Sequence, residues 1–155
     1  MTTPRQLRNA RNATVGGSLA ALAFLLATAQ AAAADLAITV ANVANAQGKV
    51  LVAVCTAETF LGPNCPYTAE EPARPGSVTV VVRKVPPGTY AVQSFHDENR
   101  NLELDRNFLG LPKEGVGFSN DAPMRFGPPR YADAALVVTE QVARTTLTLR
   151  YLVEP

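Results

Sequence analysis

Short apolar runs rich in Val, Ile, Thr and Leu recur along the chain after residue 35, separated by Gly, Pro and Asn, and none has a helical period. Short runs of β-branched residues bounded by turn residues are typical of β-strands. The pattern predicts strands at Leu36–Val43, Lys49–Thr56, Ser77–Val85, Thr89–His96, Ala134–Thr139 and Arg144–Leu152, and it allows a short strand at Pro123–Phe126.

Two turns connect neighbouring strands. The segment Asn45–Gly48 has the composition of a hairpin turn, and Pro86-Pro87-Gly88 combines a preset proline φ with a glycine that accepts positive φ. Six or seven short strands at this spacing favour an all-β fold. We expect a two-sheet antiparallel sandwich, immunoglobulin-like or transthyretin-like, rather than a closed barrel, with the strand order left open.

The first 34 residues have the order of a secretory signal peptide: three arginines, an apolar stretch from Val15 to Ala27, then small residues up to Ala34. The apolar stretch is shorter than the roughly 20 residues of a spanning helix, and nothing after Asp35 replaces it. We therefore expect a signal peptide at 1–34, cleaved after Ala34 or Ala31. A single domain at 35–155 follows, periplasmic or secreted and without a transmembrane segment.

The charge of the mature domain is nearly balanced. Cleavage removes three of the 14 basic residues and none of the 13 acidic ones, which leaves a net charge of −2. Such a surface gives no reason to expect nucleic acid or an anionic membrane as partner.

Cys55 and Cys65 are the only cysteines. Outside the cytoplasm two thiols this close in sequence are expected to form a disulfide that closes a short loop. A metal pair or a redox pair is the alternative, but the spacing is wider than Cys-x-x-Cys and no further soft ligand is nearby.

A long irregular segment begins at Asp97 and continues to about Pro123. It exceeds the ~12 to 15 residues that structureless loops usually reach, which marks it as functional or specially stabilised. Oxygen-bearing side chains alternate at its start, as in a loop that surrounds a hard cation. The calcium ligands considered are Asp97, Asn99, Asn101, Glu103 and Asp105, with Glu114 from farther along.

The match to the helix-loop-helix calcium motif is partial. Leu102 stands where that motif has its turn glycine, and Phe108 stands where a bidentate Glu closes the shell. The alternative is that the Asp and Asn side chains make turns with the backbone of a solvated loop.

No catalytic set is predicted. His96 is the only histidine, which excludes copper and zinc sites built from several histidines of one chain. Carboxylates for a hydrolase could come only from the polar loop, where acidic residues are usually solvated. We therefore predict no catalytic and no cofactor-binding residues.

Several motifs of this chain resemble one family. They are Pro87–Val92, His96–Asn101, Leu104–Asp105 and Leu109–Asn120, and the similarity extends from about residue 37 to residue 151. The chain resembles domain of unknown function 2141, an uncharacterised family of exported bacterial proteins. The resemblance implies a small exported β-domain and supplies no substrate and no catalytic residues. The family pattern has Gly where this chain has Leu102, and the cysteine pair is not part of it.

Together these features predict a non-enzymatic exported module with a calcium-stabilised loop that presents a binding surface to a protein or a glycan. With no Trp and four dispersed Tyr residues, the chain offers little for stacking on sugars, which favours protein. The alternatives are a purely structural periplasmic or surface domain and a carboxylate-dependent hydrolase.

Overall fold

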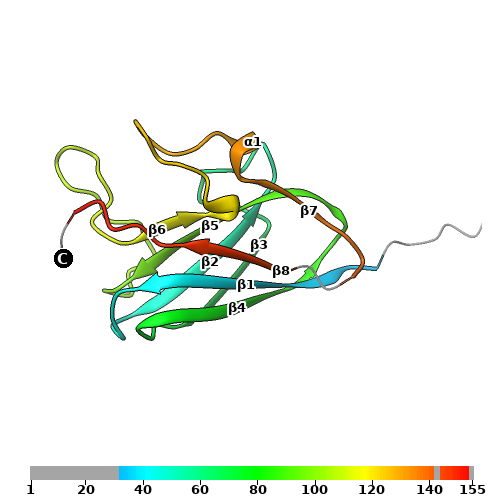
Figure 1. Ribbon diagram of the computed structural model, residues 1–155, viewed down its shortest axis with the longest axis horizontal. Coiled ribbons are helices and arrows are strands. Elements are labelled where there is room, and N and C mark those ends of the chain that lie inside the picture. The colour runs from blue at the N-terminus through cyan, green and yellow to red at the C-terminus, as the bar shows by residue number, and fades with distance from the viewer. Residues whose placement is uncertain (1–31, 142–143, 154–155) are drawn as a thin grey trace, which may run out of the picture.

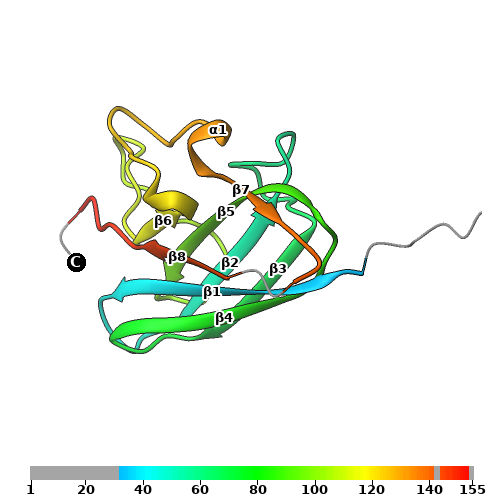
Figure 2. The same ribbon diagram turned by 45° about the vertical axis from the view of Figure 1, so that its right-hand side comes forward.

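The fold consists of two packed β-sheets. The computed structural model describes residues 32–141 and 144–153. The strands are β1 (Ala34–Val43), β2 (Lys49–Cys55), β3 (Tyr67–Pro72), β4 (Gly76–Val85), β5 (Gly88–Asp97), β6 (Val116–Phe118), β7 (Ala135–Val138) and β8 (Arg144–Thr148). A 3-10 turn η1 (Ser119–Asp121) and a four-residue helix α1 (Tyr131–Ala134) complete the elements. Figures 1 and 2 show the sheets lying across each other, with α1 and the long loops at their margins.

The smaller sheet has the order β4-β1-β8 and the larger sheet β3-β2-β5-β6, with β7 paired to the first half of β5. Strands β1, β2 and β4 alternate buried and more exposed residues along their length. This alternation arises because successive side chains of a strand point to opposite faces. The facing sides of the two sheets form the main core, which includes Ile38, Val52, Val80 and Val92. A second, smaller cluster buries Ala91, Phe118, Ala122 and Ala134. The predicted all-β sandwich is confirmed.

The structure corrects three details of the predicted fold. Strands β1 and β8 pair in parallel, whereas the other strand pairs are antiparallel. Strands β3 and β6 were not predicted, because β3 has the polar sequence YTAEEP and β6 spans only three residues. The segment Pro123–Phe126 forms no strand.

The end of β8 joins the two sheets. Residues Val116 and Arg150 form an isolated antiparallel bridge, in which each backbone N–H donates to the other residue's carbonyl. The chain therefore leaves β8 after Thr148 and runs beside β6, which is why the strand is shorter than the predicted Arg144–Leu152.

Most of the predicted signal peptide, residues 1–31, lies outside the described residues. Ala34 is buried, 6% exposed, and pairs with Val85 at the start of β1. Cleavage after Ala31 would therefore keep the whole strand, whereas cleavage after Ala34 would remove its first residue. Within the described part of the chain, no helix has the length and apolar character needed to cross a membrane.

We expect Gly48→Ala to destabilise the domain much more than Gly76→Ala. Both glycines have positive φ, +69° and +97°. A Cβ at Gly48 would lie 1.8 Å from the Asp97 carbonyl oxygen, whereas a Cβ at Gly76 meets nothing within 4 Å. Gly76→Ala should cost ~1 to 2 kcal/mol of backbone strain, and Gly48→Ala about 3 kcal/mol or more. Urea unfolding of both variants measures this, and equal losses would contradict the close approach of the two segments.

Candidate functional site

The end of β5 is held by a buried imidazole. His96 is fully buried, with Nε2 2.7 Å from the Gln47 carbonyl oxygen and Nδ1 2.9 Å from the Tyr151 hydroxyl. A carbonyl only accepts hydrogen bonds, so Nε2 carries the proton and Nδ1 accepts from the phenol. Burial raises the pKa of Tyr151, which keeps this donor protonated. The imidazole thus joins the β1–β2 turn and the C-terminal segment to β5, and both of its nitrogens are used.

The next residue, Asp97, organises the start of the long loop. Its carboxylate is buried, and the two oxygens accept backbone hydrogen bonds from Asn101 at 3.1 Å and Leu102 at 3.0 Å. Leu102 has a φ of +64°, so this position takes the left-handed conformation for which the family pattern supplies glycine. The Asp97 carboxylate fixes this turn because it accepts hydrogen bonds from the two backbone amides.

A second set of bonds closes the loop. The side-chain amides of Asn99 and Asn101 both donate to Oδ2 of Asp105, at 2.6 and 3.3 Å. The buried Glu114 carboxylate accepts from the backbone N–H groups of Glu98 and Asp105, at 3.2 Å each. Burial raises the pKa of Glu114, as do the nearby Asp97 and Asp105 carboxylates, whereas the two backbone bonds oppose the shift.

The structure brings five of the six considered calcium ligands into this hydrogen-bonded set and leaves Glu103 exposed. Among residues 32–141 and 144–153, no three His, Cys, Asp or Glu side chains are grouped as a metal site. Hydrogen bonds to amides thus give an account of the loop that needs no cation. Calcium binding stays a prediction.

The middle of the long loop is a small hairpin. Backbone bonds join Lys113 to Asp105 and Asn107 to Leu111, both 2.9 Å long, and Arg106 faces Pro112 across an isolated bridge. The tip presents Phe108 and Leu109, which are 95% and 68% exposed. This hairpin stands beside the outer face of the larger sheet.

A second loop is fixed by a disulfide and a glutamine. The predicted bond between Cys55 and Cys65 is formed. Within the loop it closes, the Leu61 N–H donates to the side-chain oxygen of Gln93 at 2.9 Å, and the Gln93 amide nitrogen donates to the Gly62 carbonyl at 3.2 Å. Strand β5 therefore anchors this loop through one side chain. The disulfide is compatible with a location outside the cytoplasm.

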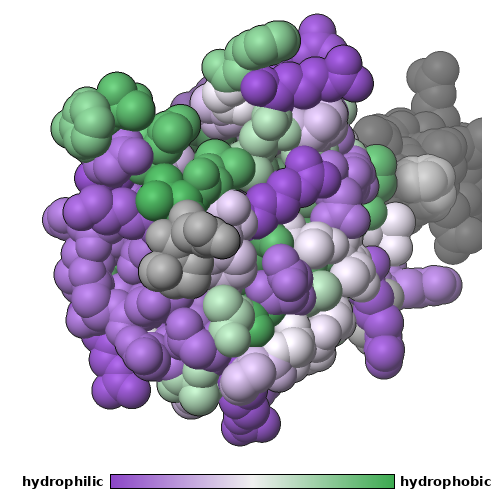
Figure 3. All heavy atoms as spheres, turned by 60° about the vertical axis from the view of Figure 1, so that its left-hand side comes forward, coloured by the Kyte–Doolittle hydropathy of each residue, from purple (hydrophilic) through white to green (hydrophobic). Residues whose placement is uncertain are grey.

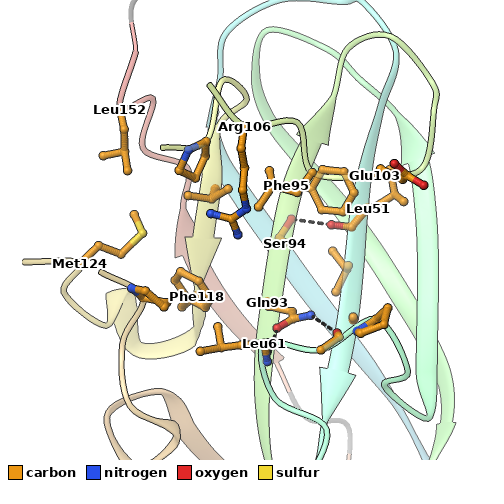
Figure 4. A pocket seen from close by; sticks show the side chains of 18 of the residues that line it. Leu51, Leu61, Gln93, Ser94, Phe95, Glu103, Arg106, Phe118, Met124 and Leu152 are labelled. Atoms are coloured by element: carbon orange, nitrogen blue, oxygen red, sulfur yellow. Dashed lines mark hydrogen bonds between the residues drawn. The ribbon is translucent and has the colours of Figure 1, made fainter. Parts of the chain in front are cut away.

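These loops wall a groove of about 1400 Å³ on the outer face of the larger sheet. Figure 4 shows its floor, where Leu51 from β2 lies beside Phe95 from β5, and Phe118 from β6 lies on the other side of β5, near Met124. The walls are the disulfide loop, the long loop, the 124–128 segment and Leu152. The exposed apolar side chains that line it are Leu61, Leu102, Leu111, Phe126 and Leu152. Apolar patches also stand out among hydrophilic side chains in the surface view of Figure 3.

The polar groups of the groove divide into two kinds. At the centre of the floor, Gln93 is occupied with the disulfide loop. The buried Ser94 hydroxyl, which follows it on β5, donates to the Leu51 carbonyl at 2.7 Å (Figure 4). Arg106 and Arg125 line the walls, and neither forms an ion pair with any residue that the structure describes. The groove therefore offers apolar contacts and these two arginines, with the carboxylates of Glu70 and Glu103 also in its lining.

A comparison with family models identifies the chain. The model described as an uncharacterized protein conserved in bacteria (DUF2141) matches residues 38–146. The chain belongs to this family. No curated protein and no solved structure gave a match. The resemblance inferred from the sequence is thus confirmed, over a slightly shorter range.

The structure gives the family-like motifs of this chain a physical role. His96 and Asp97 hold the end of β5 and the first turn of the loop, and Glu114 holds its last turn. The groove was not predicted from the sequence. Its only sequence signal is the presence of apolar residues such as Leu61, Leu102 and Phe126 in segments that otherwise have loop composition.

We expect Asp97→Asn to lower the free energy of unfolding by ~1 to 3 kcal/mol, because one buried backbone N–H loses its acceptor. Glu103→Gln, the same change at an exposed candidate ligand, should stay within ~0.5 kcal/mol. If hydrogen bonds alone hold the loop, both effects are the same in EDTA and in millimolar calcium, as measured by thermal and urea unfolding. A calcium-specific rise in the melting temperature that both variants lose would instead establish the metal site.

The raised pKa of Glu114 predicts a pH-dependent contribution to stability. The folded protein holds the Glu114 proton more strongly than the unfolded chain, so this contribution is complete below the unfolded pKa and is lost as pH rises through the folded pKa. The stability of the wild type relative to Glu114→Gln, which does not titrate, should therefore decrease as pH rises through that window. Urea unfolding of both proteins from acidic to neutral pH tests this, and a difference that grows with pH would contradict the direction of the shift.

Proposed function

We propose that this domain is a non-enzymatic, exported binding module whose ligand occupies the groove on the outer face of the larger sheet. The observation that carries the proposal is the half-buried apolar floor of Leu51 and Phe95, surrounded by the exposed apolar side chains of walls that the chain holds in place. Exposed contiguous apolar surface of this kind is characteristic of binding sites. The long loop serves as a wall of the site.

Among residues 32–141 and 144–153 no reacting group is assembled, which supports a binding role. Both nitrogens of His96 are hydrogen-bonded within the fold, and the carboxylates of Asp97 and Glu114 accept backbone N–H groups. A hydrolase would need such groups aimed at a shared space for substrate. The disulfide supports export, because such bonds persist in oxidising compartments.

The apolar lining supports an apolar ligand or the apolar segment of a partner. A glycan needs convergent hydrogen-bonding groups or stacking platforms, and the chain has no Trp. The central polar side chain of the floor, Gln93, is engaged within the protein.

We expect the mature, oxidised domain to bind the neutral apolar dye N-phenyl-1-naphthylamine with a rise in fluorescence. Ala53→Arg, on the groove floor in β2, should weaken this binding at least about tenfold, since the new side chain fills the groove and brings a charge into apolar surroundings. Ala41→Arg is the matched control, because Ala41 lies in β1 of the other sheet.

Fluorescence titration of the three proteins, each first shown to melt cooperatively, measures the effect. Dye binding by the wild type that only Ala53→Arg weakens supports the groove as the site. No dye binding, or equal binding by both variants, would overturn the proposal and favour a purely structural domain.

A further inference from the structure

One charged side chain enters the groove. Arg106 lies on the hairpin of the long loop, and its guanidinium donates one hydrogen bond, of 3.0 Å, to the Gly110 carbonyl. In the view of Figure 4 the side chain extends from the loop over the floor, with its guanidinium between Phe95 on one side and Phe118 on the other. A guanidinium has five N–H donors, so most of them stay available to a ligand.

Two acidic side chains also line the groove, and both lie away from the Arg106 guanidinium. Glu70, on β3, is paired with Lys49. Glu103 is exposed and lies beyond Phe95 from the guanidinium in Figure 4. Arg125, from the 124–128 wall, adds a second positive charge to the lining. The groove thus combines an apolar floor with cationic groups that have no carboxylate partner among the described residues.

An extended peptide fits this floor poorly. A peptide needs partners for its backbone N–H and C=O groups, and burying them unpaired is costly. The floor is the face of a sheet, so it presents side chains rather than free backbone groups, and Gln93 is already bonded within the protein. An acyl chain has no such groups to satisfy.

We propose that the groove binds a free long-chain amphiphile with an anionic head, of the fatty-acid class. The acyl chain lies along Leu51, Phe95 and Phe118, and the carboxylate is held by Arg106, whose planar guanidinium suits bidentate contact with a carboxylate. This inference rests on the proposed function and names its ligand. The open volume of about 1400 Å³ exceeds that of typical small-molecule pockets and has room for a long chain.

The charge of the domain favours a free amphiphile over a bilayer surface. Without its first 34 residues the chain has a net charge of −2, which gives no general attraction to an anionic membrane. The positive charge that matters here is local, because the Arg106 guanidinium lies over the floor of the groove. This local charge therefore favours the anionic head group of a single amphiphile.

The test is displacement of N-phenyl-1-naphthylamine by dodecanoate or by dodecan-1-ol, which has the same chain without the charge, both below the concentrations at which they aggregate. We expect dodecanoate to displace the dye more effectively than the alcohol. Arg106→Gln should weaken dodecanoate about tenfold, as expected for loss of a charge-assisted bond, and leave the alcohol unchanged. Arg106→Lys keeps the charge without the planar fork, so its affinity for dodecanoate should fall between those of the wild type and Arg106→Gln.

Arg83→Gln is the matched control, because Arg83 is exposed on β4 of the other sheet. A stronger effect of dodecanoate that Arg106→Gln alone removes supports the inference. Equal displacement by acid and alcohol, or an Arg106→Gln variant that binds dodecanoate normally, would overturn it, while dye loss in Ala53→Arg would still uphold the proposed function.

Two further measurements test the alternative occupants, a peptide segment of a protein partner and a membrane surface. Displacement of the dye by an uncharged, end-blocked apolar octapeptide but not by dodecanoate would overturn the inference in favour of a protein partner. Sedimentation of the domain with phosphatidylglycerol vesicles, with no displacement by dodecanoate, would overturn it in favour of a membrane surface.

Discussion

The placement of the long loop depends on the buried imidazole of His96. This ring spans the turn between β1 and β2, the end of β5 and the C-terminal segment through two hydrogen bonds. A buried polar group is costly unless it is fully paired, so the three segments are held in one arrangement. Asp97 follows directly, and its carboxylate turns the chain into the loop. The wall of the groove therefore begins at a rigid point.

The two faces of the larger sheet have different roles. Its inner face, with Val52 and Val92, belongs to the core that the smaller sheet covers. Part of its outer face, at Ala91 and Phe118, is covered by Phe60, Met124 and Tyr131. The part with Leu51 and Phe95 forms the groove floor. The loops around it are anchored to the strands by a disulfide, by Gln93 and by buried carboxylates. Apolar side chains on such loops stay exposed because the loop backbone is already bonded in place.

Much of the fold was predictable, because alternating or continuous apolar residues in short runs indicate strands. Strands β1, β2, β4 and β5 match their predicted ranges to within two residues. Strand β3 was missed because its sequence is polar, and it forms through backbone pairing with β2. Strand β6 was missed because three residues carry no period. The parallel pairing of β1 with β8 joins residues about 107 positions apart, which no local pattern reports.

Of the candidate site, the sequence predicted that Asp97, Asn101 and Asp105, with Glu114 from farther along, serve either a cation or the loop itself, because oxygen-bearing side chains alternate there. It also predicted the disulfide, the all-β class and the family. Only the tertiary structure decided that the carboxylate oxygens of Asp97 and Glu114 accept hydrogen bonds from backbone amides. Only it placed Leu51, Phe95 and Phe118 beside Arg106. The physical reason is that a groove is formed by strands and loops distant in sequence, and their side chains share a surface only after the sheets have packed.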